Sequence, residues 1–308
     1  MNRQALVTGG AGFIGSELVR LLLHHRYHVT VLDNFSFGRK ANLTNGVRVI
    51  KGDLLSRPSL KRAVDRRYDA VYHLAAIHFI PYCNAHPEET VRVNVEGTQS
   101  LLESLRRKPP SKIFFASTAA VYNRTDRYHR ETDFLDPSDI YGVTKLAGEF
   151  LMRVFHEQTG IPVVIGRLFN AYGPRETNPH LIPSLVEQLK QRKRRVELGN
   201  LHPFRDYIHT QDMARFIHRL LQRTRKGIFI SNIASGEEYS VRQVVQTISS
   251  VLGEKIEVQS RRSLRRKVER LHLRGDLKRL KRSIQARPSL TFSEGIRNLL
   301  CTAGILKA

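Results

Sequence analysis

Three polar side chains in the middle of the sequence have the types and the spacing that proton transfer requires. Tyr141 and Lys145 are four residues apart, so on a helix they share one face and can reach the same site. An ammonium group beside a phenol favours the phenolate, and Lys145 is therefore expected to lower the pKa of Tyr141. Thr118 follows a short apolar run, and its hydroxyl could hydrogen-bond the same substrate oxygen from a strand end. The trio predicts a proton-transfer site, although a Tyr-x-x-x-Lys pair alone also fits the packing of a surface helix.

A glycine-rich stretch near the start of the chain predicts a second kind of chemistry, the binding of a dinucleotide. Gly10, Gly12 and Gly15 stand in G-x-G-x-x-G order between an apolar run at 5–7 and a predicted helix over 16–25. The first glycine permits the turn, the second lets the backbone approach a pyrophosphate, and the third lets helix and strand pack closely. The free N–H groups at the helix start would face the phosphates.

Acidic residues after the next two predicted strands fit the same ligand. Asp33 follows the strand 29–32 and lies 18 residues after Gly15, near the spacing expected for a carboxylate that binds a ribose 2′-OH. A 2′-phosphate would be repelled there, so NAD is favoured over NADP. Asp53 follows the strand 47–51 and could hold the adenine amino group, although a helix N-cap is the alternative.

The elements that must position these residues alternate between strand and helix. Such alternation around one dinucleotide fingerprint predicts an α/β fold, a Rossmann-type doubly wound parallel sheet with a smaller C-terminal α/β substrate-binding part. The sheet is expected to occupy residues 1–165, with part of 204–233 returning to it. The substrate-binding part is expected over 166–203 and 234–308, with the substrate in the cleft between the parts. Further predicted elements are strands at 70–74, 112–116, 163–167 and 228–232 and a helix over 87–107 with Val91, Val95, Leu101, Leu102 and Leu105 as its apolar stripe.

Composition narrows the class of protein. The 308 residues are 41% apolar, and no apolar run approaches the roughly 20 residues that span a bilayer. The chain enters its first strand almost at once, so no signal peptide is expected. Cys83 and Cys301 are too few for a disulfide framework or a metal cluster, and a cytoplasmic location and no metal are expected.

The charge of the chain is strongly positive, at +23. Twelve Lys or Arg residues lie between 261 and 287, against the two acids Glu269 and Asp276, and a second basic cluster covers 190–195. A solvated basic surface is the favoured interpretation. The alternatives are nucleic acid or an anionic membrane as a partner, or steering of a diphosphate substrate. The runs lack the interleaved aromatic residues of a platform that binds single strands.

Motifs in one order along nearly the whole chain identify a family resemblance. The sequence resembles the extended short-chain dehydrogenase/reductase superfamily, in its branch of NAD-dependent nucleotide-sugar epimerases and dehydratases, and within it the UDP-glucose 4-epimerase-like enzymes. The motifs that carry the resemblance are Thr8-Gly9-x-x-Gly12-x-x-Gly15, Asp33-Asn34, Gly52-Asp53-Leu54, His73-Leu74-Ala75-Ala76, Asn94-Val95-x-Gly97-Thr98, Tyr141-x-x-x-Lys145, the run 167–175, Arg205-Asp206-Tyr207-Ile208-His209, and a C-terminal pattern from Asp276 to Ile296.

The resemblance implies a role for each matching residue. Tyr141 would be the catalytic acid and base, with Lys145 and Thr118 completing the catalytic set. The implied NAD-binding residues are Gly9, Gly12, Phe13, Ile14, Gly15, Asp33, Asn34, Asp53, Leu54, Leu74, Ala75, Ala76, His78, Asn94, Tyr141 and Lys145. The implied substrate-binding residues are Thr118, Asn170, His180, Leu181, Arg205 and Arg266, with Arg265 as the alternative to Arg266. The alternative to substrate binding by Arg205 is a surface ion pair with Asp206.

Departures from the family pattern bear on the reaction. Related 4,6-dehydratases and decarboxylases carry an acid between the catalytic threonine and the Val-Tyr that follows, whereas this chain has Ala119 and Ala120. A methyl group transfers no proton, so the alanines favour simple epimerisation. The loop 198–203 resembles dehydratase relatives and points the other way. Asn123 and the run 284–287 are two further departures.

The sequence therefore predicts an NAD-dependent nucleotide-sugar epimerase. The implied reaction is C4 epimerisation of a nucleotide-diphosphate hexose through a transient 4-keto intermediate. The alternatives are a 4,6-dehydratase or 4-keto reductase on such a substrate, or a non-catalytic protein that binds NAD or nucleic acid. The resemblance also implies a homodimer that pairs through helices at about 88–107 and 139–158.

Overall fold

A sheet of seven parallel strands forms the centre of the computed structural model, which describes residues 3–261, 270–285 and 287–307. In strand β1 (Gln4–Thr8), Ala5 and Val7 belong to the core on one face of the sheet and Leu6 to the core on the other. A strand that is buried on both faces needs helices above and below it. The remaining strands are β2 (His28–Asp33), β3 (Val47–Lys51), β4 (Ala70–His73), β5 (Ile113–Thr118), β6 (Val163–Leu168) and β10 (Ile228–Ile233).

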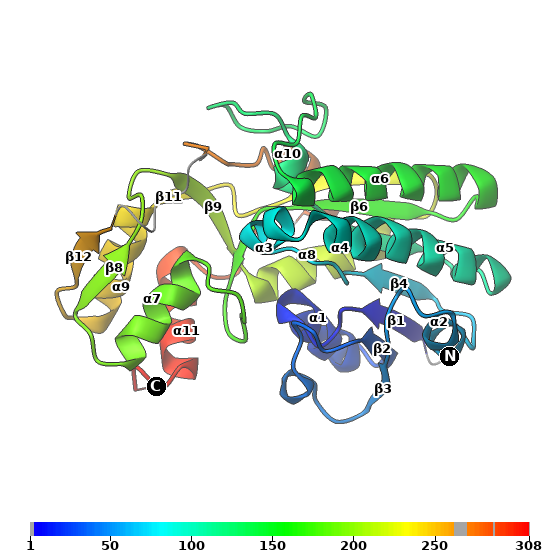
Figure 1. Ribbon diagram of the computed structural model, residues 1–308, viewed down its shortest axis with the longest axis horizontal. Helices are drawn as coiled ribbons and strands as arrows, with labels where there is room; N and C mark the ends of the chain where they lie inside the picture. The colour runs from blue at the N-terminus through cyan, green and yellow to red at the C-terminus, as the bar shows by residue number, and fades with distance from the viewer. Residues whose placement is uncertain (1–2, 262–269, 286, 308) are drawn as a thin grey trace.

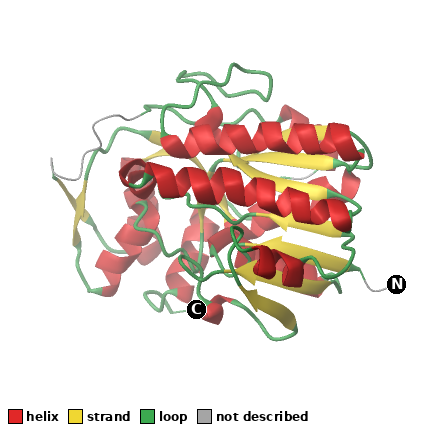
Figure 2. Ribbon diagram, turned by 45° about the vertical axis from the view of Figure 1, so that its right-hand side comes forward, coloured by secondary structure: helices red, strands yellow, loops and turns green. Residues whose placement is uncertain are grey.

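The strand order across the sheet is β10-β6-β5-β4-β1-β2-β3, so the direction of winding reverses between β1 and β4. Helices α1 (Phe13–His24), α8 (Thr210–Arg223) and α10 (Lys278–Ile284) contribute to the core on one face. Helices α2 (Arg57–Ala63), α5 (Gly97–Arg107) and α6 (Ile140–Thr159) cover the other face, which is the near face in Figure 2. The prediction of a Rossmann-type doubly wound parallel sheet is confirmed.

Residues 87–107 are helical as predicted, in three consecutive segments, but the predicted apolar stripe is wrong at Val91. Helix α4 (Pro87–Val91) runs into a π-helical segment (Arg92–Glu96) and then into α5. A π turn inserts one residue and so changes the direction in which the following side chains point. Leu101, Leu102 and Leu105 are accordingly buried as predicted, whereas Val91 is exposed and Val95 only half-buried.

A smaller part packs beside the carboxyl ends of the strands and lies at the left of Figure 1. Its strands are β7 (Asn170–Tyr172), β9 (Phe204–His209) and β11 (Glu238–Ser240) in one sheet and β8 (Arg195–Leu198) and β12 (Glu257–Ser260) in another. Helices α7 (Leu181–Lys190), α9 (Val241–Leu252) and α11 (Phe292–Thr302) supply its apolar core. The short elements that remain are α3 (Ile80–Ala85), η1 (Lys40–Asn42) and η3 (Ala119–Val121). Within 204–233, β9 belongs to this part, whereas β10 joins the central sheet and α8 packs on one face of that sheet.

None of the helices in the described ranges combines the length and the apolar character that a bilayer crossing needs.

A buried ion pair ties α6 to the sheet. Arg167 on β6 donates from Nε and Nη2 to the two carboxylate oxygens of Glu149 on α6, at 2.9 and 2.8 Å. The Ser117 hydroxyl on β5 donates to the same carboxylate at 2.5 Å. Both charged side chains are 2% exposed. A two-pronged pair of this kind fixes orientation as well as distance, so it sets how α6 lies across β5 and β6.

Replacing Arg167 with Met should therefore destabilise the protein strongly. The substitution leaves Glu149 buried without its partner, which costs about 3–5 kcal/mol of unfolding free energy. Urea unfolding measures the loss. Arg48→Met is the matched control, because the Arg48–Asp65 pair has a similar distance of 2.8 Å but lies on the surface, where such a pair contributes about 0–1 kcal/mol. Equal losses in the two variants would contradict the assigned role of the buried pair.

Candidate active site

A cavity of about 880 Å³ opens where the central strands end. Its wall includes residues that end or directly follow β1, β2, β3, β4, β5 and β6, and residues of α7 close it from the side of the smaller part. It therefore lies outside the carboxyl ends of the strands, beside the reversal between β1 and β4. This is the place at which doubly wound sheets bind ligands.

All but one of the predicted site residues that the structure describes line this cavity. They are Gly9, Gly12, Phe13, Ile14, Gly15, Asp33, Asn34, Asp53, Leu54, Leu74, Ala75, Ala76, His78, Thr118, Tyr141, Lys145, Asn170, His180, Leu181 and Arg205. Arg265 and Arg266 lie outside the described residues.

Asn94 is the exception, because it does not line the cavity, and its contact with the cofactor stays a prediction. Its side-chain amide accepts a hydrogen bond from the Ile77 N–H at 2.8 Å and donates to the Ile77 carbonyl and to Thr144 Oγ1, at 2.9 and 3.0 Å. The residue is 3% exposed. Both hydrogens of its amide nitrogen are used within the protein, so Asn94 braces the loop after β4 against α6.

At some glycines of the fingerprint the absent side chain leaves room for protein atoms, and at others it leaves room for a ligand. A Cβ on Gly15 would lie 2.1 Å from the Gly9 carbonyl oxygen, and one on Gly9 would lie 2.7 Å from the Ala75 nitrogen. These two positions are closed by the protein itself. A Cβ on Gly12 would meet only the Gly9 oxygen, at 3.2 Å, and would otherwise project into open space beside the cavity. Gly12 therefore leaves room for a ligand at the start of α1, as a pyrophosphate requires.

The carboxylates at the other end of the cavity are held in place by the loops around them. Asp33 accepts hydrogen bonds from the N–H groups of Ala11 and Phe35, at 2.9 and 2.8 Å, and burial raises its pKa. Asp53 accepts from the Asn34 side chain at 2.7 Å. The N-cap of α2 is Ser56, so Asp53 does not serve as the helix cap. The residues present thus fit a dinucleotide, with the glycine cradle for its phosphates and Asp33 for a ribose.

The proton-transfer trio forms one wall of the same cavity. Thr118 ends β5, Tyr141 lies in the first turn of α6, and Lys145 lies one turn further along. The Asp139 carboxylate caps this helix by accepting from the Gly142 N–H at 2.7 Å, which fixes the turn that carries Tyr141. The Lys145 ammonium is buried and lies 4.2 Å from the centre of the Phe115 ring.

Lys145 is expected to lower the pKa of Tyr141, but in the protein without a ligand the pKa of Tyr141 is raised. Burial raises the pKa of Tyr141 well above its usual value of 10, and a hydrogen bond with Thr118 opposes this only in part. Burial also lowers the pKa of Lys145 to about 7, against the pull of Glu149. Removing both groups from water disfavours both charged forms. Burial therefore disfavours the phenolate of Tyr141 in the protein without a ligand.

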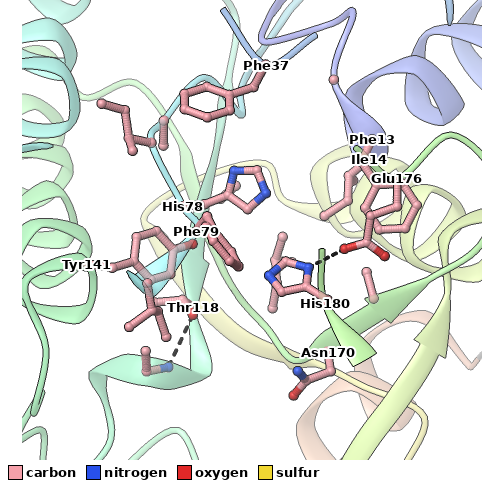
Figure 3. Close-up of a pocket in the computed structure, with 18 of the residues that line it drawn as sticks. Phe13, Ile14, Phe37, His78, Phe79, Thr118, Tyr141, Asn170, Glu176 and His180 are labelled. Atoms are coloured by element: carbon pink, nitrogen blue, oxygen red, sulfur yellow. Dashed lines mark hydrogen bonds and ion pairs between the residues drawn. The ribbon is translucent and has the colours of Figure 1, made fainter. Parts of the chain in front are cut away.

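The opposite wall carries a hydrogen-bonded pair that the sequence did not reveal. The Glu176 side chain is buried and pairs with Nδ1 of His180, and Figure 3 shows His180 between Glu176 and the wall of Thr118 and Tyr141. His78 lies beside them, and burial lowers its pKa to about 4. Only the run Glu176 to His180, with an acid and a histidine four residues apart outside a helix, could have hinted at the pair.

The two remaining predictions concern an arginine and the two alanines. Arg205 lines the cavity, and its Nη1 donates to the carbonyls of Phe204 and Arg270 at 2.8 and 2.9 Å. Ala119 and Ala120 also line the cavity, so the places where dehydratases carry an acid are methyl groups beside the trio. Among the described residues, no cluster of His, Cys, Asp and Glu side chains is arranged to hold a metal ion.

Comparison with known proteins identifies the family. The model of the NAD-dependent epimerase/dehydratase family matches residues 5–234. The chain belongs to this family. It is 32% identical over 277 residues to a UDP-glucose 4-epimerase of Corynebacterium glutamicum, with 84% of each chain covered. The predicted enzyme class and the predicted cofactor, NAD, are thereby confirmed.

Two solved structures extend the likeness to the fold. The UDP-glucose 4-epimerase of Thermus thermophilus, in complex with NAD, superposes with a TM-score of 0.87 at 30% identity, over 98% of this chain and 99% of that one. The UDP-glucuronic acid 4-epimerase of Bacillus cereus, in complex with UDP-glucuronic acid and NAD, gives 0.88 at 29% identity over the same shares. The likeness covers the central sheet and the smaller part together.

Substituting alanine at two glycines should separate ligand binding from folding. Gly12→Ala adds a methyl group toward the cavity, so we expect NAD affinity to fall at least tenfold while the unfolding midpoint changes little. Gly15→Ala meets the Gly9 carbonyl and should lower the unfolding midpoint instead. Calorimetric titration with NAD and thermal unfolding measure the two effects. A Gly12→Ala protein that binds NAD as the unmodified chain does would contradict the assigned pyrophosphate position.

Proposed function

We propose that this protein catalyses the NAD-dependent C4 epimerisation of a nucleotide-diphosphate hexose. The observation that carries the proposal is the cavity in which the glycine cradle and the trio of Thr118, Tyr141 and Lys145 meet, with Ala119 and Ala120 beside the trio. The printed names of the relatives, which include UDP-glucose 4-epimerases, support the same reaction.

Each residue of the trio has a task that follows from its chemistry. Tyr141 takes the proton of the sugar 4-OH as its carbon is oxidised and returns it after the 4-keto sugar has turned its other face. Thr118 would hydrogen-bond the same oxygen, and Lys145 would bind the nicotinamide ribose. Bound NAD would supply the hydride acceptor and, in its oxidised form, a positive ring charge. That charge favours the phenolate, which the buried chain alone disfavours.

The substrate is proposed to lie between the central sheet and the smaller part, taken as residues 1–165 with the returning segment 204–233, and 166–203 with 234–308. Asn170, His180, Leu181 and Arg205 would bind its diphosphate and nucleotide. A dehydratase would need a proton donor for a leaving hydroxyl, and the alanines at 119 and 120 do not supply one. The loop 198–203, which lines the cavity in part, favours that alternative reaction.

The substrate panel tests the reaction. Purified protein with NAD is incubated with UDP-, dTDP-, GDP- and CDP-sugars, and the products are analysed by NMR and mass spectrometry. We expect a product of unchanged mass with inverted C4. Tyr141→Phe should lower the rate about 10²–10⁴-fold, the usual contribution of a general acid–base group, whereas Tyr128→Phe, at an exposed tyrosine, should not. Loss of water from the substrate would identify a dehydratase, and full activity of Tyr141→Phe would exclude the assigned role.

We further propose a homodimer. Val143, Phe150 and Val154 follow one face of α6 at helical spacing, and Val91 on the neighbouring α4 adds to the same apolar character; each is between 41% and 58% exposed. Exposed apolar faces of this kind mark interaction sites, and they lie on the two helix segments at which the family resemblance implies pairing.

A charge in this face should separate the subunits. Phe150→Glu is expected to yield a monomer in light scattering coupled to size exclusion, because a carboxylate buried between two copies lacks a partner. Val49→Glu, which adds the same charge to an exposed valine on β3, is the control and should remain dimeric. A monomeric unmodified protein, or a dimeric Phe150→Glu protein, would contradict the proposal.

A further inference from the structure

The segment 175–180 crosses from the smaller part onto the central domain and is held there at several points. Arg175 pairs with Glu17 and donates from Nε to Ser16 Oγ at 3.2 Å, both on α1. The Thr177 hydroxyl donates to the Phe37 carbonyl at 3.2 Å. The Asn178 side-chain amide donates to Nε2 of His78 at 2.9 Å. These contacts on both sides of Glu176 fix the backbone that carries its side chain.

Glu176 and His180 form a polar pair within this segment, at the wall of the cavity. The Glu176 side chain is 5% exposed, whereas that of His180 is 36% exposed. The His180 ring is also flanked by Phe79, with ring centres 5.4 Å apart in an edge contact, and by His78 at 6.3 Å. The buried carboxylate thus holds a ring whose far side remains open to the cavity (Figure 3).

The contact decides which nitrogen of His180 carries a hydrogen. Burial raises the pKa of Glu176 and the contact with His180 opposes this rise; while Glu176 is ionised it only accepts hydrogen bonds, so Nδ1 of His180 donates to it. Nε2 then either offers a lone pair, when the ring is neutral, or donates a hydrogen, when the ring is protonated. Only the protonated ring can bind a phosphate oxygen through Nε2, and the carboxylate behind it pairs with that positive charge.

We propose that Glu176 is a positioning residue which holds His180 as a cation with Nε2 directed at the diphosphate of the bound nucleotide sugar. The inference rests on the proposed function, since it names a contact to that substrate. Glu176 itself touches no phosphate in this arrangement, because its carboxylate lies behind the ring. The cavity is proposed to receive the diphosphate of NAD and that of the substrate. The pairing with His180 means that the negative charge of Glu176 near these diphosphates is balanced by a positive one.

Ligands that differ only in phosphate test the proposal. Binding of UDP and of uridine is measured by calorimetry for the unmodified protein loaded with NAD, and for Glu176→Gln, His180→Asn and the double variant. Removing the carboxylate should weaken UDP binding about tenfold, the scale of one charge-assisted hydrogen bond, and should leave uridine binding unchanged. The double variant should bind UDP no more weakly than His180→Asn alone. Glu187→Gln, which removes one exposed charge from α7, should bind UDP as the unmodified protein does.

Nitrogen NMR of labelled histidine gives a readout that a merely structural role would not move. In the UDP complex both ring nitrogens of His180 should carry hydrogens, and in Glu176→Gln one should lose its hydrogen. UDP binding that is unchanged in Glu176→Gln, equal losses for UDP and uridine, or a neutral His180 ring in the UDP complex would each overturn the inference while the epimerase assay still stands. Absence of UDP binding and of product from every sugar of the panel would overturn the proposed function and this inference with it.

Discussion

The buried pair of Arg167 and Glu149 is the interaction on which the reactive wall depends. It joins β6 to α6, and Ser117 on β5 adds a third element to the same carboxylate. Thr118 directly follows Ser117, and Lys145 lies one helical turn before Glu149, so both reactive side chains are close in sequence to the pair. Two charges that are removed from water stay stable only in a narrow geometry. The requirement to satisfy Glu149 therefore aligns the three elements that bring the trio together.

Burial of the site also shifts the pKa values of its titratable side chains. Burial disfavours the phenolate of Tyr141 and the ammonium of Lys145, so the protein without a ligand favours the protonated form of Tyr141. A positively charged cofactor ring in the cavity changes that balance. The glycine cradle at the start of α1 and the trio lie on walls of one cavity, so in the proposed reaction binding of NAD would be coupled to activation of Tyr141. The reversal of strand order between β1 and β4 creates the space in which the two meet.

The sequence predicted what depends on local spacing and missed what depends on long-range packing. Tyr141 and Lys145 could be paired because a helix brings residues four apart to one face. Glu176 and His180 are also four residues apart, but they lie before helix α7, so helical periodicity could not predict their pairing. Asn94 matched a family motif, but only the structure shows that Ile77 and α6 use its amide. The pKa of Tyr141 could not be predicted because it depends on burial, and a nearby ammonium was the only influence visible in the sequence.

The central claim is that hydrogen leaves C4 of the sugar and returns to the same carbon from the cofactor. It is tested most directly with UDP-glucose that carries deuterium at C4, or with whichever sugar of the panel is turned over labelled in the same way, in ordinary water. The account predicts a product that is inverted at C4 and retains the deuterium there. A product whose C4 hydrogen comes from water would contradict transient oxidation at C4. Deuterium transferred to C6 with loss of water would show that the protein is a dehydratase despite Ala119 and Ala120.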